Sequence, residues 1–138
     1  MELKLELVLI PVSDVDRAKA YYTETLGFSL DVDTSPTEEF RVRQMTPPGS
    51  ACSITIGKGI TDATPGSVRG THLVVSDIVA ARGELVARGA AVSEIRHFES
   101  GTWVPGPDPE RRNYRSFADF SDPDGNTRVL QEAGQEEV

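Results

Sequence analysis

His72 is the side chain of this sequence best suited to chemistry. It precedes the apolar run 73–75, which has the composition of a strand. An unperturbed imidazole has a pKa of about 6.5, so it can serve as a general acid or base, or hydrogen-bond a bound molecule. A histidine on an apolar strand can equally be hydrogen-bonded within the protein wall, with no chemistry at all. The sequence leaves both interpretations open.

A second group of candidates lies between His97 and Tyr114, a segment rich in glycine and proline that predicts no regular structure. Long connections of this kind often cover or bind ligands. This one carries Trp103, the single tryptophan, with Arg111 and Arg112. Indole can stack on a planar ligand, and a guanidinium can pair with a carboxylate or phosphate. The alternative is that Trp103 holds the segment to its own domain or to a dimer partner.

Arg41 and Arg43 alternate with Phe40, Val42 and Gln44, so the two arginines share one face of a predicted strand. If they face a bound molecule, that molecule is an anion. If they face outward, they are solvated surface charges, which is the orientation we expect.

The sequence does not support phosphate binding by a glycine-rich loop, nucleophilic catalysis, or a nucleic-acid or membrane partner. The sequence has neither a phosphate-binding glycine loop nor a Ser-His-Asp arrangement, and Cys52 is the single cysteine. The net charge of −8 and the pI of about 4.7 argue against nucleic acid and anionic lipid. No apolar run approaches the roughly 20 residues that cross a bilayer. The first residues lack the apolar region of a signal peptide. We therefore expect a cytoplasmic protein with no nucleic-acid or membrane partner.

The elements that must position these residues follow one order twice. In each half, a strand leads to a Ser-Asp helix start and an amphipathic helix, a glycine ends the helix, and three strands follow. The first half has strands at 3–12, 28–33, 40–45 and 52–56, with helical spacing of Val15, Ala18 and Tyr22 before Gly27. The second has strands at 72–75, 91–96, 115–120 and 127–131, with the same spacing of Ile78, Ala81 and Leu85 before Gly89. Residues 13–16 have the form of a capping box that makes Ser13 the cap.

We predict one domain over residues 1–138. Module one covers about 3–57, a linker about 58–70, module two about 71–132, and a flexible tail 133–138.

Two motifs carry a family resemblance. PVSDVDRAKAYY at 11–22, followed by Leu26-Gly27-Phe28, resembles the opening of vicinal-oxygen-chelate proteins, and the DPDGN of 122–126 resembles their closing hairpin. The resemblance to this glyoxalase/bleomycin-resistance/dioxygenase superfamily covers about residues 3–132. It implies an α+β fold of two βαβββ modules whose curled mixed sheets enclose a pocket, and a homodimer. The family includes metal-dependent lyases, isomerases and dioxygenases, and also metal-free proteins that sequester antibiotics.

The resemblance also implies where metal ligands would lie, and these positions carry unsuitable residues. Divalent metals of this kind need His or Glu. The implied positions hold Leu7, Gly70, Val129 and one of Ser53 or Thr55. A two-residue shift of register would bring His72 to one position, but a single imidazole does not hold a metal. We therefore expect no metal and no cofactor.

The leading hypothesis is a metal-free protein that binds a small aromatic molecule, such as an antibiotic, in a pocket. The residues expected to contact that molecule are Leu7, His72, Trp103, Tyr114, Val129 and Gln131. The alternative is an enzyme of the superfamily, a lyase, isomerase or dioxygenase. It would be metal-free with His72 as the catalytic acid or base, or metal-dependent through ligands not recognised in the sequence.

Overall fold

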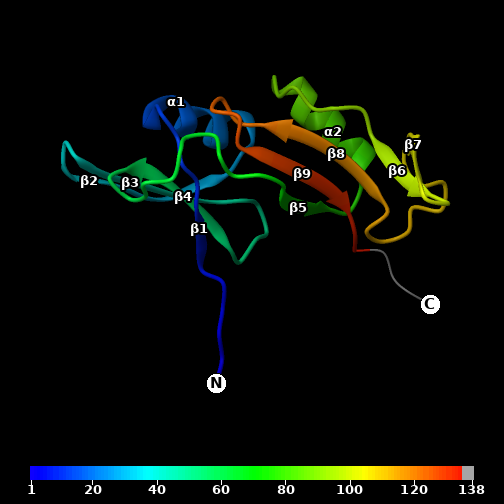
Figure 1. The fold of residues 1–138 in the computed structure, drawn as a ribbon, viewed down its shortest axis with the longest axis horizontal. Helices are drawn as coiled ribbons and strands as arrows, with labels where there is room; N and C mark the ends of the chain where they lie inside the picture. The colour runs from blue at the N-terminus through cyan, green and yellow to red at the C-terminus, as the bar shows by residue number, and fades with distance from the viewer. Residues whose placement is uncertain (135–138) are drawn as a thin grey trace. The chain divides into compact units, whose positions relative to one another are not determined.

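The computed structural model describes residues 1–134, which form two compact units. The first unit comprises Met1–Val68 and Asp122–Asn126, and the second comprises Arg69–Ser121 and the chain from Thr127 onward. Each unit is a mixed sheet with a helix on it (Figure 1). The boundary at residues 68 and 69 falls in the segment expected to link the modules. Of the expected flexible tail, residues 135–138 lie outside the described residues.

The first unit has the βαβββ order. Its elements are β1 (Leu7–Leu9), α1 (Val15–Ala20), the π-helical turn η1 (Tyr21–Thr25), β2 (Ser29–Thr37), β3 (Phe40–Thr46) and β4 (Ser53–Lys58). The sheet order is β1-β4-β3-β2, with β1 parallel to β4 and the other pairs antiparallel. The strand expected over 3–12 is wrong in extent. Only three residues pair with β4, and the last bond toward the N-terminus runs from the Ser53 amide to the Glu6 carbonyl.

The first helix begins one residue later than predicted. Asp14, not Ser13, is its N-cap, because the Asp14 carboxylate accepts the Arg17 amide at 3.0 Å. The predicted apolar spacing is confirmed, since Val15, Ala18 and Tyr22 are all buried; the other buried apolar residues of this unit are Ile10, Leu26, Phe28, Met45, Ile54 and Ile56. Gly27 has φ +77°, the left-handed conformation that ends a helix readily only at glycine.

The two arginines of β3 lie on the helix side of their sheet. Arg43 is buried, its Nε lies 2.7 Å from Asp33, and its Nη1 donates to the Thr34 carbonyl. Arg41 pairs with Asp16 on α1 at 2.8 Å. The expectation of a solvated surface charge is therefore wrong for Arg43, because the long β2 strand supplies it with acceptors.

The second unit repeats the order with an added hairpin. Its elements are β5 (Thr71–Val75), α2 (Ile78–Ala87), β6 (Arg96–Glu99), β7 (Thr102–Pro105), β8 (Ser116–Ser121) and β9 (Thr127–Glu132). The sheet order is β5-β9-β8-β6-β7, with β5 parallel to β9. Asp77 caps α2 by accepting the Val79 and Ala80 amides, and Gly89 follows its end with φ +101°. The helix packs on β8 and β9.

Two predictions for this unit are wrong. The strand expected over 91–96 begins only at Arg96, and the segment expected to be irregular contains the β6–β7 hairpin. Its turn is formed by Ser100 and Gly101, which both have positive φ, as a two-residue hairpin turn requires. The registered pair Phe98 and Trp103 then holds the two strands together.

The chain thus has the predicted α+β fold of two βαβββ-like modules with mixed sheets, although neither sheet is strongly curled. Among the described residues, no helix is long and apolar enough to cross a membrane.

Candidate functional site

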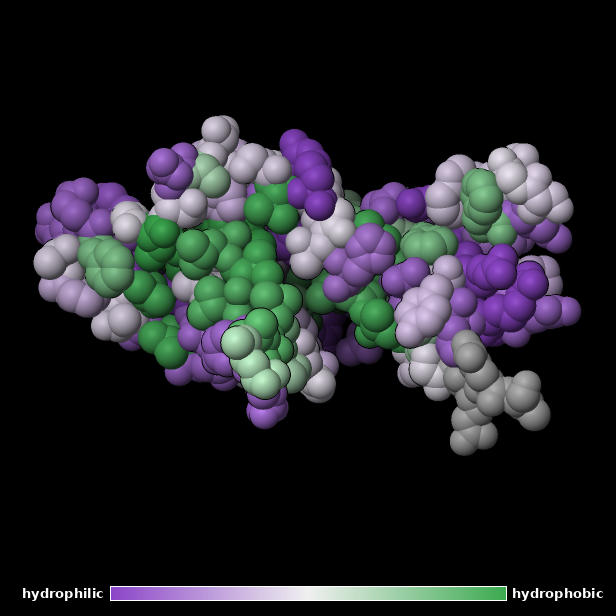
Figure 2. Space-filling view, turned by 60° about the horizontal axis from the view of Figure 1, so that its bottom comes forward, coloured by the Kyte–Doolittle hydropathy of each residue, from purple (hydrophilic) through white to green (hydrophobic). Residues whose placement is uncertain are grey.

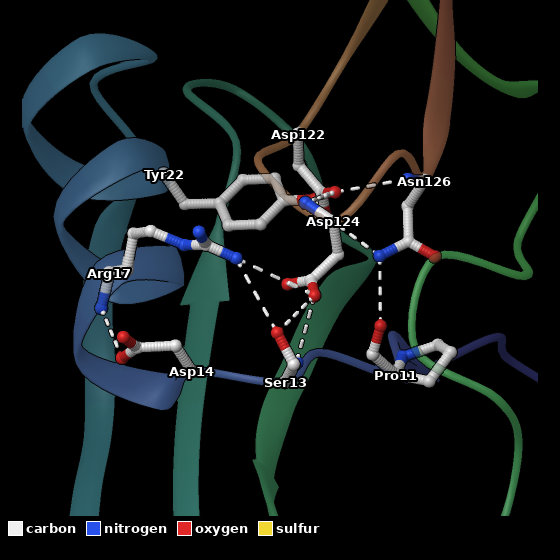
Figure 3. Close-up of polar contacts among 8 residues, drawn as sticks. All are labelled: Pro11, Ser13, Asp14, Arg17, Tyr22, Asp122, Asp124 and Asn126. Atoms are coloured by element: carbon white, nitrogen blue, oxygen red, sulfur yellow. Dashed lines mark hydrogen bonds and ion pairs between the residues drawn. The ribbon is translucent and has the colours of Figure 1, made fainter.

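The DPDGN motif of residues 122–126 is bound to the first unit by buried polar contacts (Figure 3). Tyr22 on η1 donates its hydroxyl to Asp122 at 2.6 Å. The Asn126 side-chain amide donates to the Pro11 carbonyl at 2.9 Å and to Asp122 at 2.8 Å. Asp124 accepts the backbone amide of Ser13 at 3.0 Å. These contacts fasten the turn between β8 and β9 to the start of α1, so the motif has a structural role.

The second unit carries an exposed aromatic cluster. Phe98 and Trp103 face each other across the β6–β7 hairpin with ring centroids 5.1 Å apart, and Trp103 meets Phe117 on β8 at 5.5 Å, both edge to face. These geometries are favourable for aromatic pairs. Yet 50% of Trp103 and 44% of Phe98 remain exposed. The cluster is therefore an ordered aromatic surface that still has area to cover.

The cluster lies on the face of the sheet turned away from α2. In β8 and β9, the residues buried under the helix are Ala118, Phe120 and Leu130, and the residues between them point the other way. The strand registers align these outward residues across the sheet. We call this surface the open face; it consists of His72, Val74, Arg96, Phe98, Trp103, Phe117, Asp119, Val129 and Gln131.

An ion pair lies beside the aromatic rings of the open face. Arg96 donates to both carboxylate oxygens of Asp119, at 2.7 and 3.3 Å. Its guanidinium carbon also lies 4.9 Å from the centre of the Trp103 ring, which is a cation–π contact. Beside its aromatic rings, the open face therefore offers a donor group, the Arg96 guanidinium, and an acceptor group, the Asp119 carboxylate.

The structure places four of the six predicted contact residues on one face of the second sheet, with His72 and Trp103 on its opposite edge strands, β5 and β7. His72 is paired in register with Val129, Gln131 with Phe117, and Trp103 belongs to the same face. His72 is exposed, and its Nδ1 lies 2.7 Å from the Gly70 carbonyl.

The other two predicted residues lie elsewhere. Leu7 is on β1 of the first unit, opposite Ser53. Tyr114 precedes β8 with φ +65°, is exposed, and donates its amide to the Glu132 carbonyl.

The arginines that follow the hairpin are held by the protein itself. Arg112 binds Asp108 through Nε and Nη2, both at 2.9 Å, and these bonds hold the pKa of that buried carboxyl well below its usual range. Arg111 binds the buried Glu132 at 2.7 Å. Of the two roles that the sequence left open for these arginines, ligand contact or structural anchoring, the contacts match the second: both side chains anchor the segment between β7 and β8.

Sequence reasoning missed Arg96, Phe98, Phe117 and Asp119. A signal for the hairpin was present, because Ser100-Gly101 between two aromatic residues is typical of a tight β-turn. A hairpin there would have placed Phe98 opposite Trp103. The Arg96–Asp119 pair had no local signal, since its members lie 23 residues apart.

A cleft of about 510 Å³ lies in the first unit beside the start of α1. Its lining is mainly polar and includes Ser13, Asp14, Arg41, Lys58 and Asp62. None of the six predicted contact residues lines it.

Comparison with models of protein families identifies the family of this chain. Residues 4–130 match the model of the Glyoxalase/Bleomycin resistance protein/Dioxygenase superfamily. The chain belongs to this superfamily. A search of curated proteins finds no match.

Several solved structures resemble the chain over nearly its whole length. TnmS3, an antibiotic binding protein from Streptomyces sp. CB03234, is 34% identical, with 96% of this chain and 98% of that chain covered and a TM-score of 0.74. A glyoxalase/bleomycin resistance protein from the same organism is 34% identical over 93% and 99%, with a TM-score of 0.70. A superfamily member from Sphaerobacter thermophilus DSM 20745 is 28% identical over 96% and 98%, with a TM-score of 0.73.

The metal used by many superfamily members does not fit this chain. The register pairs Leu7 with Ser53, so two of the implied ligand positions offer an alkyl group and a hydroxyl. Val129 occupies a third implied position and offers another alkyl group, and Gly70 occupies the fourth, where there is no side chain. Over residues 1–134, no three His, Cys, Asp or Glu side chains cluster as a metal site would require.

Proposed function

We propose that this chain is a metal-free, small-molecule-binding member of its superfamily. It holds an aromatic compound, such as an antibiotic, against the open face of the second unit. The observation that carries the proposal is the exposed cluster of Phe98, Trp103 and Phe117. Rings ordered by mutual contact, of which Trp103 and Phe98 are left about half exposed, are suited to a planar ligand, because covering them removes apolar area from water at about 25 cal/mol per Å².

The relatives support the same proposal. TnmS3 is an antibiotic binding protein, and it matches 96% of this chain at 34% identity. The ligand contacts proposed for this chain are the predicted His72, Trp103, Val129 and Gln131, together with Phe98 and Phe117. Leu7 and Tyr114 remain proposed contacts that the open face does not include.

His72 gives the second candidate function a specific basis. Because its imidazole is exposed on β5 beside Val129 of β9, a molecule that extends over these two strands comes within reach of an acid or base. Under that alternative, His72→Ala abolishes turnover of an identified substrate and leaves its binding nearly intact. Under the binding function, the same variant only weakens binding.

We also propose a homodimer. The first unit presents a broad apolar area (Figure 2), and its exposed apolar residues include Leu3 at 87% and Leu5 at 71%. Apolar areas of this extent often mark association sites. Sedimentation equilibrium should give twice the chain mass, and a monomer at all concentrations would contradict the dimer.

The binding function is tested by a thermal-shift screen against aromatic antibiotics, followed by titration of Trp103 fluorescence. Trp103 is the single tryptophan, so quenching reports on the open face directly. Phe98→Ala should weaken binding of any hit by about 1–2 kcal/mol, roughly 5- to 30-fold, because it removes one ring of the cluster.

Phe40→Ala is the matched control. Phe40 is 43% exposed, against 44% for Phe98, but it lies on β3 of the first unit. It should leave affinity unchanged. Equal losses from both variants, or no compound that quenches Trp103, would refute the proposed site.

A further inference from the structure

We infer that Asp119 sets the charge of the ligand: the open face takes uncharged planar aromatic compounds and rejects anionic ones. This inference rests on the proposed function. It begins from Arg96, the guanidinium of the open face that contacts the aromatic cluster. A guanidinium stacked on Trp103 beside Phe117 would by itself be a strong site for an aromatic carboxylate, sulfonate or phosphate.

Asp119 neutralises that guanidinium. Its two oxygens take one N–H from each Nη of Arg96, at 2.7 and 3.3 Å. A guanidinium has five N–H groups, so three remain that can donate to a neutral acceptor. The pair therefore keeps hydrogen-bonding capacity while its net charge is zero.

A ligand on the rings would meet both members of the pair. The Arg96 side chain is 31% exposed and that of Asp119 is 46% exposed, so the carboxylate is the more accessible of the two. Asp119 is paired in register with Val129 and follows Phe117 by two residues, which places it on the same face. An anion that approached Arg96 would meet the Asp119 charge at close range, and like charges repel there.

Neighbouring polar groups of the open face do not restore an anion site. Gln131, opposite Phe117, offers an uncharged amide. His72 lies on the edge strand β5, which β9 and β8 separate from β6, and it is the same in every variant compared below. Arg115, which precedes β8, is exposed, and its charge is the same in every variant compared below. The Arg96–Asp119 pair is thus the part of the face that selects by charge.

The test uses two dyes that differ by one sulfonate: N-phenylnaphthylamine, which is uncharged, and anilinonaphthalene sulfonate, which is anionic. Each is titrated at low ionic strength, where charge effects are least screened, with quenching of Trp103 as the signal. The wild type should bind the neutral dye more tightly. Asp119→Asn should tighten binding of the sulfonate by about fivefold or more, and change that of the neutral dye by less than about twofold.

Asp62→Asn is the matched control, because it removes one negative charge from an exposed position in the first unit. It should change neither affinity. Arg96→Gln leaves Asp119 unpaired and should weaken binding of the sulfonate below that of the wild type.

The possible outcomes distinguish charge selection by Asp119 from ligand binding on the open face. Tight binding of both dyes by the wild type, or no selective gain in Asp119→Asn, overturns the charge selection and leaves the binding face in place. An equal gain in Asp62→Asn also overturns it, since net charge would then be the cause. Failure of both dyes to quench Trp103 contradicts the proposed binding face itself, and the charge selection with it.

Discussion

Tyr22→Phe removes one buried hydroxyl from the first unit and leaves the rest of the core unchanged. That hydroxyl donates to Asp122 at 2.6 Å, and Tyr22 is fully buried. A hydrogen bond to a charged group contributes about 1.5–3 kcal/mol to stability. Asp122 keeps the Asn126 side-chain amide on the same oxygen, so the loss should lie in the lower part of that range, at about 2 kcal/mol.

Urea denaturation at neutral pH measures this loss, and the melting temperature should fall by about 6 °C, at about 3 °C per kcal/mol for a chain of this size. Tyr114→Phe removes an exposed hydroxyl and is the control, which should change stability by less than about 0.5 kcal/mol. If Tyr22→Phe changes stability as little as Tyr114→Phe, the contact does not fasten the 122–126 turn and the structural role assigned to the motif is wrong.

Two further predictions concern the second unit. Arg111→Ala should lower the free energy of unfolding by about 3 kcal/mol, because it leaves the buried Glu132 carboxylate without its cation; urea denaturation measures the loss. The Gly106 carbonyl, and then Glu99, raise the pKa of His97 in the folded state. The stability that protonated His97 contributes is therefore complete below about pH 6.5 and is lost as pH rises through the raised folded pKa. Glu99→Gln should reduce this loss of stability, which is measured as the change in melting temperature between pH 6 and pH 8, a range that spans about pH 6.5.

A surface ion pair provides the control for the Arg111 prediction. Arg88→Ala removes an exposed arginine that pairs with Glu84 on the surface of α2, and it should cost about 0.5 kcal/mol or less. Equal costs for Arg111 and Arg88 would mean that Glu132 does not need its partner. For His97, a Glu99→Gln variant with the pH dependence of the wild type would show that the Glu99 contact is too weak to act on the imidazole.

Local patterns predicted most of the fold. The two helices, their ends at Gly27 and Gly89 and the strand order are each encoded within a few residues, and their repetition identifies the modules. The same reasoning failed where two local solutions competed. Ser13 and Asp14 can each cap a helix, and the structure uses Asp14 because the Ser13 hydroxyl donates to Asp124, 111 residues away.

The candidate site was predicted in part, for a related reason. His72, Val129 and Gln131 share a face because strand periodicity and the family pattern fix their orientation. The Arg96–Asp119 pair depends on the register between β6 and β8, which no local pattern specifies. The buried position of Arg43 depends in the same way on a neighbouring strand, because β2 is long enough to bring Asp33 to its guanidinium.

The measurement that tests the central claim most directly is an NMR search for contacts between a bound aromatic ligand and the Trp103 ring. The ligand is the neutral dye or an antibiotic found in the screen, and the single tryptophan gives an unambiguous indole signal. We predict cross-relaxation from ligand aromatic protons to Trp103, Phe98 and Phe117, with one saturating shift of the indole N–H. Contacts confined to apolar residues of the first unit, with the indole signal unmoved, would contradict the account.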